Sequence, residues 1–188
     1  GVSAFAEHAI TVRQSLVKVD NALPFDEAAV FGCAVMTGVG AVTNTVQPHR
    51  GSSIAVIGLG GVGLAALLGT RLTEAAIVIA CDLSDDKLAL ARTMGATHTI
   101  NAGDPQALEQ IRDLTRGGVH YAFEMAGSVK AMELAYAATR RGGTTVTAGL
   151  SNPKHLFSIP HVGIVAEERT IKGSYLGSCD PARDIPRY

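Results

Sequence analysis

Three glycines and one aspartate have the spacing of a dinucleotide-binding site. Gly58, Gly60 and Gly63 form a Gly-x-Gly-x-x-Gly turn after the apolar segment 54–57, and Asp82 closes the next apolar segment nineteen positions after Gly63. In such a turn the first glycine permits a tight bend, the second lets a pyrophosphate approach the backbone, and the third lets a helix pack closely on a sheet. The flanking apolar segments and the acid make this pattern more specific than the glycines alone.

The backbone of the turn and the carboxylate after it recognise different parts of a dinucleotide. A helix that begins near Gly60 presents the N–H groups of Gly61 and Val62, together with the positive end of its dipole, to the phosphates. Leu59 completes the turn. The Asp82 carboxylate can accept hydrogen bonds from both hydroxyls of the adenosine ribose and repels a 2′-phosphate. We therefore expect NAD, rather than NADP, as the cofactor.

The segments around these residues alternate between strand and helix patterns. The apolar runs 53–58 and 76–82 predict strands, and the run 61–72 predicts the helix between them. Ser84 is expected to cap the next helix, which Gly95 ends, and residues 104–105 to cap another that runs to 115. Further strands are expected at 98–100, 119–125, 144–148 and 170–176, and further helices at 128–139 and 162–167. The pattern predicts an α/β fold with a doubly wound, parallel, six-stranded (Rossmann) sheet in the strand order 3-2-1-4-5-6.

The remaining segments predict connecting structure. The alternating runs 5–10 and 16–19 predict strands that belong to another unit. A helix is expected to open at Pro24, to break at 32–33, and to be followed by a second helix over 35–45. The run 140–143, Arg-Arg-Gly-Gly, predicts a helix C-terminus with a glycine stop rather than a phosphate site.

Charge and composition exclude several classes of partner. The formal net charge is −1, so the chain lacks the basic field that holds nucleic acid. The runs 28–49 and 51–70 contain no Asp, Glu, Lys or Arg and are long enough to span a bilayer. Their glycines and polar residues favour buried elements of an α/β core, so no membrane partner is expected. Three scattered cysteines indicate a reducing, cytoplasmic setting.

Four motifs together resemble the zinc-dependent medium-chain alcohol dehydrogenases. They are Gly-Cys-Ala-Val-Met-Thr-Gly-Val-Gly-Ala-Val at 32–42, Val-Ile-Gly-Leu-Gly-Gly-Val-Gly at 56–63, Asp82 with Lys87, and Gly-Ser-Tyr-Leu-Gly-Ser at 173–178. The resemblance covers essentially the whole chain and implies the coenzyme-binding domain of such an enzyme. Residues 31–177 would form that domain, residues 1–30 the end of the catalytic domain, and residues 178–188 the start of the segment that returns to it.

The resemblance implies a reaction and a set of site residues. The family oxidises an alcohol reversibly to an aldehyde or ketone with hydride transfer to NAD, and a catalytic zinc lowers the pKa of the bound alcohol. Cys33 matches the third zinc ligand, Thr37 a residue beside the nicotinamide, and Lys87 a basic residue near the ribose. The nicotinamide side is matched by Ala148, Gly149, Leu150, Ser174 and Leu176.

Two departures from the family limit what this chain should do alone. The first two zinc ligands, a Cys and a His followed by Glu, and the four-cysteine structural zinc cluster lie upstream of Gly1 in the family, and Gly1 is not a natural start. None of the six histidines has metal-site spacing, and none is given a catalytic role. We expect the intact parent to be a zinc dehydrogenase acting on a small alcohol or aldehyde, and this chain to bind NAD without turnover. We also expect a homodimer through the sheet edge formed by 144–148 and 170–176, as in the family.

Three other functions share part of this pattern. The coenzyme domain of a glutathione-dependent formaldehyde dehydrogenase would be similar. A non-catalytic nucleotide sensor would have no need for the thiol of Cys33 beside a nicotinamide. An S-adenosylmethionine-dependent methyltransferase also has a glycine turn and a following acid, but its methyl donor lacks the pyrophosphate that the full glycine spacing suits. The sequence does not identify the alcohol.

Overall fold

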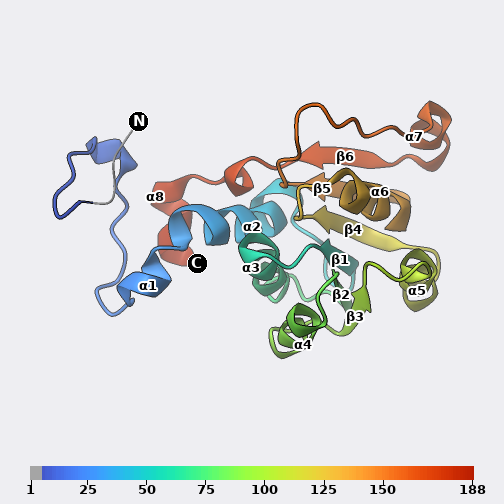
Figure 1. The fold of residues 1–188 in the computed structure, drawn as a ribbon, viewed down its shortest axis with the longest axis horizontal. Helices are drawn as coiled ribbons and strands as arrows, with labels where there is room; N and C mark the ends of the chain where they lie inside the picture. Colours follow the sequence, from blue (N-terminus) through green and yellow to red (C-terminus); the bar gives the residue numbers. More distant parts are fainter. Residues whose placement is uncertain (1–5) are drawn as a thin grey trace.

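Six parallel strands form one sheet in the order β3-β2-β1-β4-β5-β6 in the computed structural model, which describes residues 6–188 (Figure 1). The order confirms the predicted doubly wound topology. After β3, at one edge, the chain crosses back over the sheet to β4, which pairs with the free side of β1, so the strand order reverses between β1 and β4. The strands are β1 (Ser53–Ile57), β2 (Ile77–Asp82), β3 (His98–Asn101), β4 (Val119–Glu124), β5 (Thr139–Thr147) and β6 (Thr170–Gly173).

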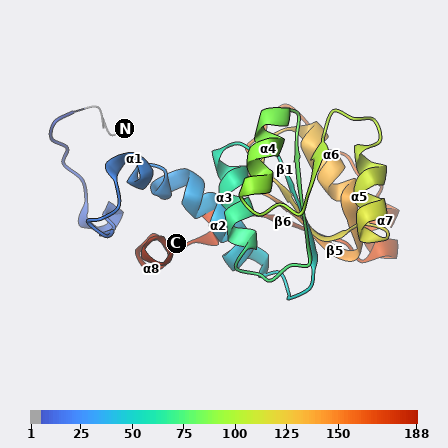
Figure 2. The same ribbon diagram turned by 90° about the horizontal axis from the view of Figure 1, so that it is seen from below.

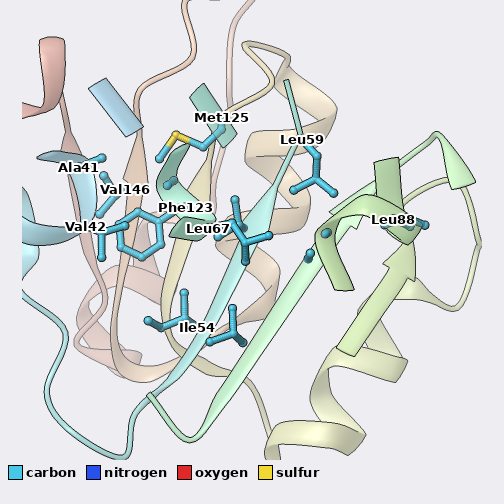
Figure 3. Packing of buried hydrophobic residues seen from close by; sticks show 14 residues of the cluster. Ala41, Val42, Ile54, Leu59, Leu67, Leu88, Phe123, Met125 and Val146 are labelled. Carbon is cyan, nitrogen blue, oxygen red and sulfur yellow. The ribbon is translucent and has the colours of Figure 1, made fainter. Parts of the chain in front are cut away.

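Helices cover both faces of the sheet. Ile54 and Val56 of β1 face one apolar cluster, and Ala55 and Ile57 face the other, as the two-residue period of a strand requires. The first cluster, shown in Figure 3, packs the sheet against α3 and α4, and the second packs it against α5 and α6. These helices are α3 (Gly61–Thr70), α4 (Asp85–Thr93), α5 (Ala107–Thr115) and α6 (Val129–Ala138), and α7 (His161–Glu167) precedes β6.

A helical run of 22 residues, Phe25–Val46, precedes the sheet. It consists of α1 (Phe25–Ala28), the π-helical turns η2 (Phe31–Val35) and η3 (Ala41–Val46), and α2 (Met36–Gly40) between them. The predicted break at 32–33 is wrong, because a wide turn absorbs these residues: Val35 N–H donates to the Val30 carbonyl at 3.1 Å. Within residues 6–188, this helix alone is long and apolar enough to cross a membrane by length and composition. Its α2 residues are buried against α3, which accounts for their apolar character.

The strands predicted at 5–10 and 16–19 do not form in the described part of the chain, and Phe5 lies outside it. The segment instead holds a single 3-10 turn, η1 (Arg13–Ser15), and it extends away from the sheet (Figure 1). Ile10 is 98% exposed and Leu16 is 62% exposed. Alternation alone gave no strand here, since a strand needs a hydrogen-bonding partner.

The C-terminal segment packs against the helical run. It comprises η4 (Leu176–Ser178), α8 (Pro181–Asp184) and η5 (Ile185–Arg187). The Asn44 side-chain amide donates to Asp184 Oδ2 at 3.2 Å and to the Tyr188 hydroxyl at 3.1 Å. Figure 2 shows α1 and α8 extending from the same end of the molecule. The domain division at residues 30 and 178 stays a prediction, and its first boundary falls inside the helical run.

Residues 140–143 form a bulge in β5, so the predicted helix C-terminus with a glycine stop is wrong at this position. Helix α6 already ends at Ala138, and β5 begins at Thr139. Val119 pairs with Thr139, but Tyr121, only two residues further on, pairs with Thr144. The extra residues of β5 therefore lie outside the regular ladder. Gly142, at φ +71°, provides the left-handed backbone that the bulge needs.

The serines that precede α4 and α6 differ in whether their side chains cap the helix. Ser128 caps α6, because its Oγ accepts the N–H of Ala131 at 3.1 Å. Ser84 holds the corresponding position before α4, but its side chain makes no capping bond, contrary to the prediction. Its own N–H donates instead to Asp82 Oδ1 at 3.0 Å. The start of α4 is thereby tied to the end of β2, where the candidate site lies.

Candidate dinucleotide-binding site

The glycine turn between β1 and α3 has the geometry that the sequence predicts. Gly58 has φ +92°, and a Cβ there would lie 2.6 Å from the Ala126 Cβ. A Cβ on Gly63 would overlap the carbonyl oxygen of Gly58, which explains why the helix can pack so closely on the turn. A Cβ on Gly60 would meet open space. The first and third glycines are thus required by the fold, whereas the second leaves an open approach to the backbone.

The first turn of α3 points donors toward this open approach. Gly60 and Gly61 are exposed. The Leu64 N–H, bonded to the Gly60 carbonyl at 2.9 Å, makes the helix's first regular bond. The N–H groups of residues 61–63 precede that bond, as at every helix N-terminus, and α3 is ten residues long. The arrangement suits an anion such as a pyrophosphate.

Asp82 closes β2 beside the turn with two of its acceptor positions in use. Oδ2 accepts the Leu59 N–H at 2.6 Å, and Oδ1 accepts the Ser84 N–H. A carboxylate offers about four acceptor positions, so about two remain for a ligand. Burial alone raises the carboxyl's pKa, but these N–H groups and the Lys87 ammonium, 3.6 Å away, more than offset it and hold the pKa below its usual range. Asp82 is therefore ionised near neutral pH.

Leu59 contributes only its backbone here. Its side chain is 1% exposed and lies in the apolar cluster of Figure 3, so it faces away from any ligand at the turn. Its N–H is bonded to Asp82. Leu59 was predicted to bind the cofactor, but its part in the site is to hold the Asp82 carboxylate in position.

A cavity of about 530 Å³ lies beside Asp82 and Gly58. Its walls come from the segments after β2, β3 and β4 and from α5 and α6, which is the crevice outside the carboxyl ends of the strands. Most of these residues were not predicted from the sequence. Several directly follow predicted strands, and that position alone could have indicated that they line the ligand crevice. The unpredicted lining residues include Leu83, Ala102, Gly103, Asp104, Pro105, Leu108, Lys130 and Leu134.

A second cavity, of about 310 Å³, brings together residues from five separate parts of the sequence. It unites the predicted residues Cys33, Thr37, Val62, Ala148, Gly149, Leu150, Ser174 and Leu176. Met125, Ala126, Gly127 and Tyr175 also line it and were not predicted. Ala126 lines both cavities, so the two lie next to each other at the loop after β4. Gly60, Gly61, Gly63 and Lys87 line neither cavity; the first three shape the turn, and Lys87 contacts Asp82.

Comparison with known proteins assigns this chain to one family. The family described as zinc-binding dehydrogenase matches residues 61–187. This chain belongs to the zinc-binding dehydrogenases. It is 35% identical over 190 residues to alcohol dehydrogenase 1 of Petunia hybrida, which spans 99% of this chain and 50% of that protein. It is 35% identical to the alcohol dehydrogenase of Malus domestica over the same shares.

Solved structures agree with the family. The structure of an alcohol dehydrogenase zinc-binding domain protein from Burkholderia ambifaria superposes with a TM-score of 0.87 at 33% identity, over 91% of this chain and 46% of that one. Benzyl alcohol dehydrogenase from Acinetobacter calcoaceticus gives 0.87 at 32% identity, over 91% and 47%. The chain corresponds to the coenzyme-binding domain of a zinc-dependent medium-chain alcohol dehydrogenase, and it spans about half the length of the curated relatives it matches.

A zinc ion does not fit the residues that this zinc-binding dehydrogenase chain supplies. Among residues 6–188, no three His, Cys, Asp or Glu side chains are grouped as a metal would require. A catalytic zinc site needs three protein ligands and an open position. Cys33 is exposed at the wall of the second cavity, beside Thr37. Cys33 therefore belongs to no group of three potential metal ligands in the described part of this chain.

Glu124, at the carboxyl end of β4, is a site residue of this family member that the sequence did not reveal. Its side chain is 1% exposed. Oε1 accepts the N–H groups of Ala126 at 2.8 Å and Gly127 at 2.6 Å, and Oε2 accepts the Thr147 hydroxyl at 2.7 Å. A Cβ on Gly149 would lie 2.8 Å from Oε2. The carboxylate thus holds the loop after β4 and the end of β5 together where they line the second cavity.

The second and third glycines of the turn predict separable effects of mutation. In Gly60→Ala the new Cβ meets open space, so we expect unchanged stability and about tenfold weaker NAD binding, because the methyl group occupies the approach of the pyrophosphate. In Gly63→Ala the Cβ overlaps backbone, so we expect a free energy of unfolding lower by about 1–3 kcal/mol. Urea unfolding and NADH fluorescence titration measure both effects. Equal loss of stability in the two variants would contradict this division of roles.

Proposed function

We propose that this chain binds NAD as the coenzyme domain of an alcohol dehydrogenase, which transfers hydride reversibly between a small alcohol and NAD. The observation that supports it most strongly is Asp82. Its ionised carboxylate, with about two free acceptor positions, borders a 530 Å³ cavity beside the glycine turn. Two ribose hydroxyls would satisfy those positions, whereas a 2′-phosphate would be repelled.

The two cavities suit the two ends of the dinucleotide. The larger one has apolar walls that include Leu83, Pro105 and Leu108, which fits an adenine ring. The pyrophosphate would pass over Gly60 to Val62 at the start of α3. The nicotinamide would then lie in the smaller cavity with Thr37. Buried Ser174, whose Oγ lies 2.9 Å from Thr45 Oγ1, holds the wall of that cavity in place.

Cys33 is proposed as one zinc ligand of the intact enzyme, with the other ligands supplied by residues outside this chain. It lines the cavity assigned to the nicotinamide, which is the position at which an alcohol must meet the ring. This chain alone would hold the coenzyme without completing the reaction. The glutathione-dependent formaldehyde dehydrogenase branch, the nucleotide sensor and the methyltransferase are not favoured, since the relatives are named as alcohol dehydrogenases.

The test of this function separates binding from turnover. Purified chain is titrated with NADH, and the nicotinamide fluorescence is followed; saturable binding is expected. Primary and secondary alcohols are then added with NAD and zinc, and no absorbance change at the NADH band is expected. Absence of NADH binding would refute the proposed function, and alcohol-dependent NADH production by this chain would refute the claim that it does not turn over.

We also propose a homodimer through β6, the edge strand of the sheet. Segment 144–148, expected to share this edge, falls largely in β5, which pairs with β4 on one side and β6 on the other, so that part of the expectation is wrong. All four β6 residues are exposed, including Ile171 at 37%. An exposed edge strand offers unpaired backbone groups to a second copy. Sedimentation of the chain at tens of micromolar, roughly the range in which modest interfaces associate, should show dimer, and Ile171→Lys should shift it toward monomer. Monomer throughout would contradict the pairing. Cytoplasmic localisation remains a prediction from cysteine usage.

A further inference from the structure

The bulge in β5 forms a third cavity at the end of the sheet opposite the coenzyme site. The cavity has a volume of about 360 Å³, and His49, His120, Arg140 and Arg141 contribute its charged and titratable groups. His120 and Arg140 lie near the start of β4 and β5, whereas Asp82 is the last residue of β2 and Gly58 directly follows β1. A five-residue strand separates these ends by about 16 Å. The cavity is therefore separate from the proposed dinucleotide site.

Glycines fix the bulge in its observed shape. Gly118 has φ +128°, and a Cβ there would lie 2.7 Å from the Ala138 carbonyl and 2.9 Å from the Arg140 nitrogen. A Cβ on Gly143 would lie 2.9 Å from the Arg140 carbonyl and 3.0 Å from that of His120. The close approach of β4 and β5 at the bulge depends on both glycines. This close approach places the Arg140 guanidinium beside the His120 ring.

The sequence predicted that Arg140 and Arg141 would end a helix, but they do not bond the last carbonyls of α6. Arg112 donates to the Ala137 carbonyl at 3.3 Å, and Arg169 donates to the Tyr136 carbonyl at 2.6 Å. Arg141 donates to the Ala166 carbonyl at 2.7 Å. The ion pairs formed within residues 6–188 include neither Arg140 nor Arg141. The cavity is lined by no carboxylate, so its positive charge is not compensated there.

The hydrogen bonds of the His120 ring place its Nε2–H donor against a second donor, the Arg140 guanidinium. The Ser53 backbone N–H, which can only donate, lies 3.0 Å from His120 Nδ1. Because this N–H points at Nδ1, we assign Nδ1 as the acceptor, to which the Ser53 hydroxyl, 2.8 Å away, can donate as well. A neutral ring then carries its proton on Nε2. That Nε2 lies 3.1 Å from a guanidinium nitrogen of Arg140, which is also a donor. Burial lowers the pKa of His120, and the charges of Arg140 and His49 lower it further, so the ring is neutral at pH 7.

We propose that this cavity binds a phosphate-class oxyanion, either the free ion or the phosphate of a small monoester. One oxygen would accept from both His120 Nε2–H and the Arg140 guanidinium, which resolves the donor–donor contact. A guanidinium is well suited to such an oxyanion. The cavity is larger than one phosphate group, which leaves space for the body of an ester. The proposal uses none of the coenzyme-binding residues and does not rest on NAD binding.

The test is a titration of the isotopically labelled chain with inorganic phosphate, followed by NMR at constant ionic strength. We expect saturable shifts of the His120 ring and of the Arg140 side chain. Arg140→Gln should weaken binding at least tenfold, whereas Arg92→Gln, an exposed arginine on α4 outside the cavity, should leave it unchanged. Unfolding curves of both variants confirm that they are folded.

Three results would overturn the proposal. Shifts confined to Gly60–Val62 would assign phosphate to the start of α3. Equal shifts with chloride would show unspecific charge screening, and unchanged binding in Arg140→Gln would exclude the bulge. Glycerol phosphate, titrated in parallel, distinguishes the source: tighter binding than phosphate supports a monoester, and weaker binding supports the free ion.

Discussion

Replacing Asp82 with asparagine is expected to weaken NAD binding by at least about tenfold and to narrow the preference for NAD over NADP. Two effects act together. The uncharged amide no longer repels a 2′-phosphate. Its single oxygen can keep only one of the bonds from the Leu59 and Ser84 N–H groups, which now bond separate carboxylate oxygens, and its NH₂ group faces the other N–H as a second donor. Asp82→Gly removes every acceptor and should lower the affinity for NAD further. Calorimetric titration with both coenzymes measures the ratio.

The matched control for this prediction is Asp86→Asn. Asp86 has the same charge, is exposed in the first turn of α4 and lines neither cavity. It should leave the ratio of NAD to NADP affinity unchanged. If Asp82→Asn and Asp86→Asn gave the same ratio as the original chain, Asp82 would not contact the ribose.

Replacing Glu124 with leucine is expected to lower the free energy of unfolding by about 3 kcal/mol. The substitution leaves the N–H groups of Ala126 and Gly127 and the Thr147 hydroxyl without their acceptor. For a chain of this size the corresponding fall in Tm is roughly 6–12 °C. Because the same loop lines both cavities, NADH affinity should fall as well. Urea unfolding and fluorescence titration of the folded fraction measure the two effects.

Glu124→Gln and Glu133→Leu complete this experiment. The glutamine retains one carbonyl oxygen, which can still accept from Ala126 and Gly127, so its loss of stability should be smaller than that of the leucine. Glu133 is exposed on α6, and Glu133→Leu should change stability by no more than about 0.5 kcal/mol. A Glu124→Leu variant as stable as Glu133→Leu would show that the carboxylate does not hold the loop.

The sheet order was predictable because it depends on local patterns that repeat. Apolar runs such as 54–57 and 76–81 predicted buried strands, and the alternation with helices predicted a parallel sheet. The glycine turn and Asp82 were predictable for the same reason, since all of their requirements lie within thirty residues of sequence. The family resemblance then placed Cys33 and Thr37 in a common site, and the second cavity does bring them together.

Other features depend on contacts that local sequence does not contain. The role of Glu124 requires Thr147, which lies on the neighbouring strand. Arg-Arg-Gly-Gly at 140–143 has the composition of a helix end, but α6 is already complete at Ala138, and Gly142 supplies a bulge instead. Gly32 predicted a helix break, yet a wide π turn accommodates it without one. At Glu124 and in the bulge a contact with a neighbouring strand decided the outcome, and at Gly32 a local backbone bond from Val35 to Val30 did.

Calorimetric titration of this chain with NAD, NADP and S-adenosylmethionine tests the central claim most directly. We expect saturable binding of NAD at one site per chain, weaker binding of NADP, and no measurable heat with S-adenosylmethionine. Gly60→Ala in parallel should weaken the NAD signal without changing stability. NADP binding as tight as NAD binding, or no binding of NAD by the folded chain, would contradict the assignment of the glycine turn and Asp82 to an NAD site.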